Sequence, residues 1–294
     1  CAQYALGKIY RDGQGVEKDI QKAVALFTLA ATKENSFAAF ALGKLYLAGD
    51  AALPRDPAAA LKWLTYAAEL GNQFAQYRLG KLLLKGDDGI PKDVIAAIRW
   101  LTAAAKQENG YAEYALALVY LTGEDAPKDS VKALSLLKRS AGRGNQFAQY
   151  RLGKLLLQGE DAPKDVKAAI RWLTAAAEQG NQYAQYALGK LYLLGKEVPK
   201  DRSSAIKWFQ LATDQGNEYA QYFLEHMDDR LGQPPVAAVI SLFHHLANIF
   251  QEQNQPPPSG GVRVAVDRKL LRKIKAKKIA QGHKADDHEP EMQL

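Results

Sequence analysis

A segment of nine residues recurs with a period of 36 or 37 residues, and this repeat limits the possible folds more than any other feature of the chain. Residues 2–10, 75–83, 148–156 and 184–192 all follow the pattern Ala-Gln-Tyr-x-Leu-Gly-Lys-x-x, and less regular copies lie between and after them. Such a period, kept over most of the chain, is typical of a solenoid. Each unit of a solenoid buries its apolar face only by stacking on its neighbours.

Each repeat contains the patterns of two helices. In segment 184–192 the apolar residues fall at positions i, i+3, i+4, i+7 and i+8, which form one face of an α-helix. A glycine such as Gly195 follows, where a helix end favours a left-handed residue. Lys-Asp, as at residues 164–165, precedes the second helix, and the aspartate suits the N-cap position. The second stripe includes Trp172, and Gly-Asn, as at residues 180–181, ends that helix.

Small residues at fixed positions allow neighbouring helix backbones to approach closely. Five repeats have a glycine in the middle of the first helix, and Ala117 replaces it in the fourth repeat. Together these motifs resemble the Sel1-like repeat, a relative of the tetratricopeptide repeat. The resemblance implies an all-α protein, a right-handed α-solenoid of helix–turn–helix repeats. We expect residues 1–227 to form about six repeats and a degraded seventh.

The pattern changes after residue 227. Residues 228–254 contain one more amphipathic segment, which we interpret as a capping helix that closes the solenoid core. Residues 255–266 are rich in Pro and Gly and are predicted to be a linker. Residues 267–294 are predicted to form a basic helix and a polar tail. No segment is long and apolar enough to suggest a membrane span.

The sequence contains no pattern typical of a catalytic, metal or cofactor site. It lacks a nucleophile elbow, a phosphate-binding loop and a His-Glu-x-x-His motif. The single cysteine, Cys1, excludes a disulfide framework and favours a reducing, cytoplasmic location. The five histidines follow the regular repeats, and none has convincing ligand spacing. We therefore expect no catalytic residues, no metal and no cofactor, and we expect the chain to start inside a longer protein.

Polar residues recur on the first helix of each repeat and suggest a surface for a protein partner. First helices of tetratricopeptide-like arrays line the concave side, so the resemblance implies a groove for an acidic or extended peptide. The alternative is that these residues are simply the solvated side of an amphipathic helix. The candidate residues are Lys8, Lys44, Gln76, Arg78, Lys81, Gln149, Arg151, Lys154, Gln185 and Lys190.

The basic character of the chain is concentrated near residue 270. Seven of the eleven residues 268–278 are Lys or Arg, and a helix with this charge can bind DNA by neutralising phosphates. It has no aromatic residue for base stacking, so a solvated or partner-docking helix stays open as an alternative. The candidate nucleic-acid contacts are Arg268, Lys269, Arg272, Lys273, Lys275, Lys277 and Lys278.

A narrower resemblance concerns the whole arrangement of repeats, His-His, proline-rich linker and basic segment. It looks like the C-terminal region of conjugative mobilisation relaxases, whose nicking chemistry lies in an N-terminal domain. This resemblance implies a scaffold with accessory DNA contact in a DNA-transfer complex. The alternative is a general adaptor in signalling or envelope assembly, without a nucleic-acid role. The oligomeric state is left open.

Overall fold

The computed structural model describes residues 2–86 and 89–226, and this part of the chain is built from helices. The chain divides into two compact units, Cys1–Asp228 and Asp229–Leu294, and every described helix belongs to the first unit. The predictions for residues 228–254, 255–266 and 267–294 lie outside the described residues. The described helices are α1 (Ala2–Asp12), α2 (Ile20–Ala31), α3 (Ser36–Ala48), α4 (Pro57–Glu69), α5 (Gln73–Lys85), α6 (Val94–Lys106), α7 (Gly110–Thr122), α8 (Ser130–Gly142), α9 (Gln146–Gln158), α10 (Val166–Glu178), α11 (Gln182–Leu194), α12 (Arg202–Thr213) and α13 (Glu218–His226).

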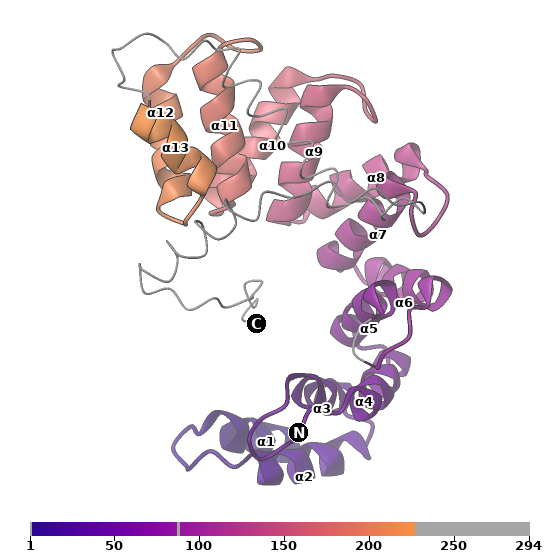
Figure 1. Cartoon of the computed structure of the whole chain (residues 1–294). Coiled ribbons are helices and arrows are strands. Elements are labelled where there is room, and N and C mark those ends of the chain that lie inside the picture. The colour runs from indigo at the N-terminus through magenta and orange to yellow at the C-terminus, as the bar shows by residue number, and fades with distance from the viewer. Residues whose placement is uncertain (1, 87–88, 227–294) are drawn as a thin grey trace, which may run out of the picture. The chain divides into compact units, whose positions relative to one another are not determined.

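The helices form antiparallel pairs that follow one another in chain order within this unit (Figure 1). We call the odd-numbered helices the first helices and the even-numbered helices the second helices. Each helix packs against the next one along the chain, and some first helices also touch, as α5 touches α7. The solenoid expected from the repeat is therefore confirmed, and α13 lies where the sequence predicts a degraded seventh copy.

Helix ends follow the local sequence signals. The side chain of Asp165 accepts a hydrogen bond from the Ala168 N–H at 2.9 Å and caps α10, and the other second helices are capped in the same way. Glycines such as Gly195, with φ of 63°, end the first helices in positive-φ conformations. The asparagine of Gly-Asn has a role that the pattern did not reveal. Asn181 caps the following helix by accepting a hydrogen bond from Ala184 N–H.

The glycine in the middle of five of the first helices permits close packing on the second helix of the same repeat. A Cβ atom at Gly153 would lie 2.7 Å from Cγ of Leu173, closer than two carbon atoms can approach. Leu173 is fully buried at this contact. In the fourth repeat Ala117 is also fully buried, so the helix pair α7–α8 forms despite the substitution.

Two glutamates adopt the backbone conformation that other repeats reserve for glycine. Glu34 and Glu108 have φ of 60° and 67°, whereas the equivalent Gly180 has φ of 88°. Left-handed backbone is unfavourable for residues with a Cβ atom, by about 1–2 kcal/mol. The tight connection between repeats therefore forms with either residue type, at some cost where glycine is absent.

Candidate partner-binding face

The predicted partner-binding residues separate into surface residues and interior residues. Lys8, Lys44, Arg78 and Lys81 are exposed, and Arg151, Lys154 and Lys190 are half-buried. The three glutamines are buried, with exposed fractions of 6% for Gln76, 5% for Gln149 and 3% for Gln185. The cationic residues thus occupy a surface of the first helices, and the glutamines lie beneath it.

Aromatic residues accompany the lysines on this surface. The ammonium groups of Lys44, Lys81 and Lys154 lie 5.9–6.0 Å from the ring centroid of the aromatic residue four positions earlier, one helical turn away. Such contacts are weakly favourable at exposed sites. We call this surface the first-helix face, defined by Tyr4, Lys8, Phe37, Phe40, Lys44, Phe74, Tyr77, Arg78, Lys81, Tyr111, Tyr114, Leu118, Phe147, Tyr150, Arg151, Lys154, Tyr183, Tyr186 and Lys190.

Rings of this face meet across every junction between repeats. Tyr77 lies 6.0 Å from Tyr111 of the next repeat, and Tyr114 lies 6.3 Å from Phe147, measured between ring centroids. The equivalent pairs in the other repeats have the same tilted geometry at 6.0–6.4 Å. These distances suit favourable aromatic pairs, so the rings form a continuous row that joins successive first helices.

Burial and neighbouring charges perturb the titration of this face. Burial raises the pKa of Tyr150 to about 12 because it disfavours the phenolate. Burial also lowers the pKa of Lys154, and the positive charges of Arg151 and Lys190 lower it further. Lys190 therefore lies close enough to Lys154, one repeat away, for the two charges to interact. The cations of α9 and α11 therefore interact across the junction between their repeats.

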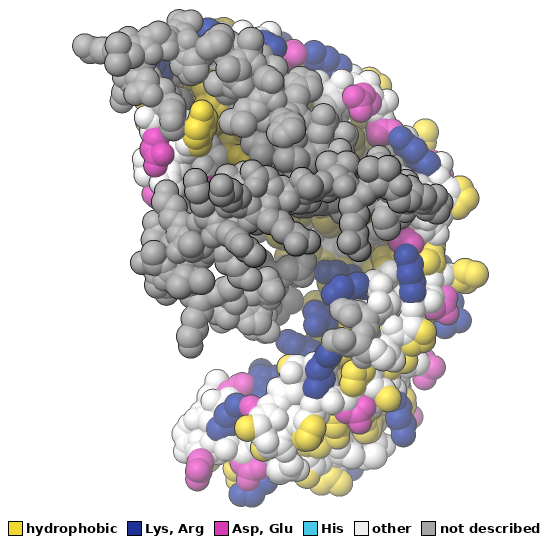
Figure 2. Space-filling view, viewed as in Figure 1, with side chains coloured by type: hydrophobic (Ala, Val, Ile, Leu, Met, Phe, Trp, Pro, Cys, Tyr) yellow, Lys and Arg dark blue, Asp and Glu magenta, His cyan; other side chains and the backbone are white. Residues whose placement is uncertain are grey.

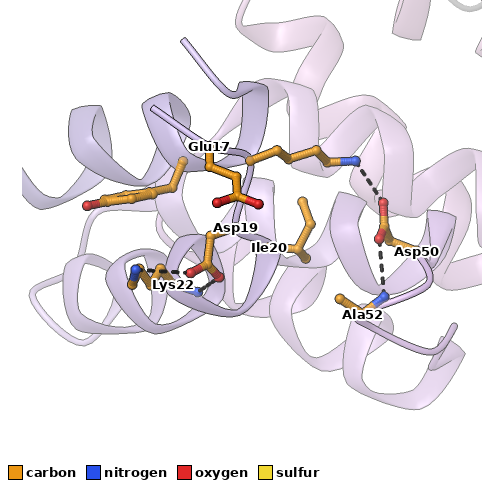
Figure 3. A pocket seen from close by; sticks show the side chains of 8 residues that line it. Glu17, Asp19, Ile20, Lys22, Asp50 and Ala52 are labelled. Atoms are coloured by element: carbon orange, nitrogen blue, oxygen red, sulfur yellow. Dashed lines mark hydrogen bonds and ion pairs between the residues drawn. The ribbon is translucent and has the colours of Figure 1, made fainter. Parts of the chain in front are cut away.

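Four lysines in the loops that lead into second helices behave differently, because each is paired with an acidic residue of the next repeat. Lys18 lies 2.9 Å from Asp50, and Figure 3 shows this pair at the loops that lead into α2 and α4. Lys92, Lys128 and Lys164 form the same pair with an acidic residue one repeat later, at 2.6–2.8 Å. No motif of the repeat marks these lysines as ion-pair partners. Their acidic partners lie 32 or 33 residues later, a spacing that no helical pattern indicates.

By contrast, Lys44, Lys81 and Lys154 have no ion-pair partner within the described residues. The first helices α3, α5 and α9 contain no acidic residue at all. Figure 2 shows Lys and Arg side chains gathered around α5 in the view of Figure 1. The described part thus neutralises the loop lysines Lys18, Lys92, Lys128 and Lys164 and leaves Lys44, Lys81 and Lys154 without an acidic partner.

The buried glutamines brace the junctions between repeats. The amide of Gln76 donates a hydrogen bond to the Ala68 carbonyl of the preceding repeat at 3.0 Å, and its oxygen accepts one from Gln107 at 2.9 Å. Gln149 and Gln185 make the same two bonds in their repeats. The structure therefore does not place these glutamines on the binding surface. Their side-chain N–H groups and oxygens already form hydrogen bonds, with a backbone carbonyl 8 residues earlier and a glutamine amide about 30 residues later, so these bonds are not open to a ligand.

An ion cluster replaces this brace in the fourth repeat. Glu113 stands at the glutamine position, is 0% exposed, and accepts a hydrogen bond from Arg139 Nε at 2.9 Å. Arg143 occupies the place of Gln107 and lies 3.3 Å from the other Glu113 oxygen. Because a carboxylate cannot donate, Arg139 bonds the Ala105 carbonyl instead, at 3.4 Å. Compared with the third, fifth and sixth repeats, the fourth repeat thus differs at all three positions of the brace. This joint difference is visible in the sequence, but the repeat motif does not reveal its meaning.

Two hollows of the described part lie apart from the candidate residues of the first-helix face. The pocket in Figure 3 has a volume of about 470 Å³, and its Asp19 and Asp50 are engaged with Lys22 and Lys18. A shallower groove of about 680 Å³ lies on the second helices and includes Trp63. Within residues 2–86 and 89–226 no three His, Cys, Asp or Glu residues are placed to hold a metal ion. In the same residues no helix is long and apolar enough to cross a bilayer.

Comparison with known proteins adds to these observations. A family model described as "Sel1 repeat" matches residues 2–35, 36–72, 73–109, 110–145, 146–181 and 182–217. The chain is similar to a protective antigen of uropathogenic Escherichia coli with an SLR fold, at 34% identity and a TM-score of 0.69. It is also similar to a Sel1 repeat protein of Oxalobacter formigenes, at 34% identity and a TM-score of 0.70.

Neither match covers the whole of this chain or the whole of the similar protein. They cover 79% and 77% of this chain, but only 49% of the E. coli protein and 65% of the Oxalobacter protein. A search of curated proteins found no match. The six matched repeats have the same boundaries as the helix pairs from α1–α2 to α11–α12.

Proposed function

The chain belongs to the Sel1 repeat family, and we propose that it is a non-catalytic scaffold that binds an extended acidic segment of another protein on its first-helix face. The observation that carries this proposal is the contrast between its two sets of lysines. Four loop lysines each have an acidic partner, namely Lys18, Lys92, Lys128 and Lys164. By contrast, Lys44, Lys81 and Lys154 have none in the described part.

The first-helix face offers contacts that suit an extended peptide. Half-buried rings provide apolar area, and lysines one helical turn away provide charge. Because the rings recur in every repeat and the lysine in five of the six, a chain running along the solenoid meets this pair of contacts several times. Charge complementarity of this kind contributes to specificity and to the rate of association.

A matched pair of triple variants tests the proposal. The probe is a fluorescein-labelled peptide, Glu-Glu-Ser-Ser-Ser-Glu-Glu, and binding to the full chain is measured by fluorescence anisotropy at low salt. We expect K44A/K81A/K154A to weaken binding roughly tenfold or more, because the three lysines of α3, α5 and α9 that have no acidic partner in the described part are removed. The control K92A/K128A/K164A removes the same charge from the loops and should bind within about twofold of the parent chain. Equal weakening by both variants would show that only net charge matters and would refute the proposal.

A finer assignment concerns DNA transfer. The resemblance to the C-terminal region of mobilisation relaxases, together with the seven Lys and Arg residues of segment 268–278, supports an accessory DNA contact by that segment. Its test is retention of duplex DNA by the full chain at rising salt. Deletion of residues 268–278 should abolish retention, and equal retention by the deleted form would contradict the assignment.

The alternative is a general adaptor in signalling or envelope assembly. It shares the first-helix face but gives segment 268–278 no role in binding nucleic acid. Affinity capture with the full chain separates the two assignments. Recovery of signalling or envelope proteins, with no DNA retention even at low salt, favours the adaptor.

A further inference from the structure

The charge on the first-helix face is interrupted in its middle, and we infer that the face selects peptides in which an apolar residue stands between two acidic groups. The inference rests on the proposed function, since it specifies the peptide that the same face binds. It follows from helices α5, α7 and α9, which belong to three successive repeats.

Helices α5 and α9 present nearly the same surface. Residues 72–86 and 145–159 differ only at Lys85 and Gln158. Each helix contributes an arginine and a lysine to the face, Arg78 with Lys81 and Arg151 with Lys154. Two cationic surfaces of the same sequence therefore flank the helix between them, the one on α5 more exposed than the one on α9.

Helix α7, which lies between them, contributes no charge to the face. Its only charged residue, Glu113, is fully buried and engaged by Arg139 and Arg143. At the position where α5 and α9 have Lys81 and Lys154, α7 has the half-buried Leu118. The face is thus basic, apolar and basic along the direction of the solenoid.

The three surfaces are continuous. Ring contacts join α5 to α7 through Tyr77 and Tyr111, and α7 to α9 through Tyr114 and Phe147. The charge of Arg151 also reaches Tyr114, whose pKa is raised by burial and lowered in part by this arginine. A peptide that contacts both α5 and α9 must therefore pass over Leu118.

The spacing of the contacts sets the spacing of the peptide. Packed helices lie about 8–10 Å apart, and an extended chain rises about 3.3 Å per residue, so one repeat corresponds to about three peptide residues. Acidic groups over α5 and α9 are then about six residues apart, with the residue over Leu118 midway. An acidic residue at that midpoint would lose water without gaining a cation, whereas an apolar residue would bury its surface against Leu118.

The experiment compares two labelled peptides, Glu-Glu-Ser-X-Ser-Glu-Glu with X either Leu or Glu, by anisotropy with the full chain. We expect the parent chain to bind the Leu peptide roughly tenfold more tightly, from partial burial of one leucine and the absence of a cation for the central glutamate. The variant L118K places at residue 118 the lysine that five other repeats have, so it should fold. It should reverse the preference and favour the Glu peptide.

A second variant controls for the added charge. Q158K gives α9 the lysine that α5 has at residue 85, at an exposed position near the end of the helix. It should strengthen both peptides equally and leave the preference for Leu unchanged. Thermal denaturation of both variants checks that the solenoid is intact.

The outcomes separate this inference from the proposed function. Reversal by L118K but not by Q158K supports the inference. Equal affinities for the two peptides in the parent chain, or the same response to L118K and Q158K, would overturn it. If binding still depends on Lys44, Lys81 and Lys154 in that case, the proposed function stands without the selectivity. If neither peptide binds, both are wrong.

Discussion

Replacing Arg139 by alanine distinguishes the structural account from one based on the repeat alone. The equivalent residues of α6 and α10 are Ala103 and Ala175, so matching the repeats would suggest that R139A is neutral or stabilising. The structure predicts the opposite. Arg139 supplies two of the hydrogen bonds to the buried carboxylate of Glu113 and one to the Ala105 carbonyl.

The magnitude follows from the burial of the carboxylate. Breaking a buried ion pair costs about 3–5 kcal/mol when one charge is left uncompensated. Two features reduce this figure, because Arg143 remains 3.3 Å from Glu113 and the Arg139 side chain is itself 51% exposed. We therefore expect R139A to lower the free energy of unfolding by about 2–3 kcal/mol. The thermal midpoint should fall by about 4–12 °C for a chain of this size.

The assay is thermal denaturation of the full chain followed by circular dichroism. The neighbouring exposed lysine provides the control, and K138A should lie within about 0.5 kcal/mol of the parent chain. The triple variant E113Q/R139A/R143Q rebuilds the amide brace of the third, fifth and sixth repeats. It should recover the stability to within about 1 kcal/mol, because an ion cluster replaced as a whole leaves no unpaired charge. A neutral R139A, or a triple variant as unstable as R139A, would refute the reasoning.

Three further predictions concern the packing and the ends of the helices. G153A should destabilise the chain by about 1–3 kcal/mol, because its Cβ would lie 2.7 Å from Leu173. G142A should stabilise the chain by about 0.4–1 kcal/mol, because its Cβ would meet no atom within 4 Å. The denaturant midpoints of the two variants should therefore move in opposite directions. E34G should raise the free energy of unfolding by about 0.5–1 kcal/mol, since glycine accepts the φ of 60° without strain, and an unchanged thermal midpoint would contradict this. Hydrogen bonds from Ser203, and then from Ser204, lower the pKa of Asp201 to about 2, so its N-cap contribution is complete above about pH 4 and is lost as the pH falls toward 2. The parent chain should therefore lose thermal stability relative to D201N over that range, because asparagine caps the helix without titrating, and parallel curves would exclude the effect.

Most of the fold could be read from the sequence because its signals are local. The period of 36 or 37 residues, the aspartate before each second helix and the glycine after each first helix fixed the elements and their order. The alanine and leucine stripes, such as Ala184 and Leu188, identified the core correctly because helical periodicity decides which residues share a face. These inferences needed only residues within one or two helical turns of one another.

The candidate site was predicted only in part. Lys44 and Lys81 lie on the surface, as an amphipathic helix suggests, but Gln76 on the same helix is buried. Helical position could not separate them, because the fate of Gln76 depends on a carbonyl of the preceding repeat and on Gln107 at the end of the next helix. The pairing of Lys92 with Asp125 depends in the same way on the loop of another repeat.

The sequence by itself therefore determined that the chain is a stack of helix pairs, which residues cap the second helices and end the first ones, and which apolar residues form most of its core. Only the tertiary structure decided which polar residues close the junctions and which remain available to a ligand. The physical reason is that a buried polar group needs a hydrogen-bond partner, and here that partner lies about 30 residues away in the sequence. The packing of neighbouring repeats decides whether the two groups come together, whereas the caps form within a single repeat.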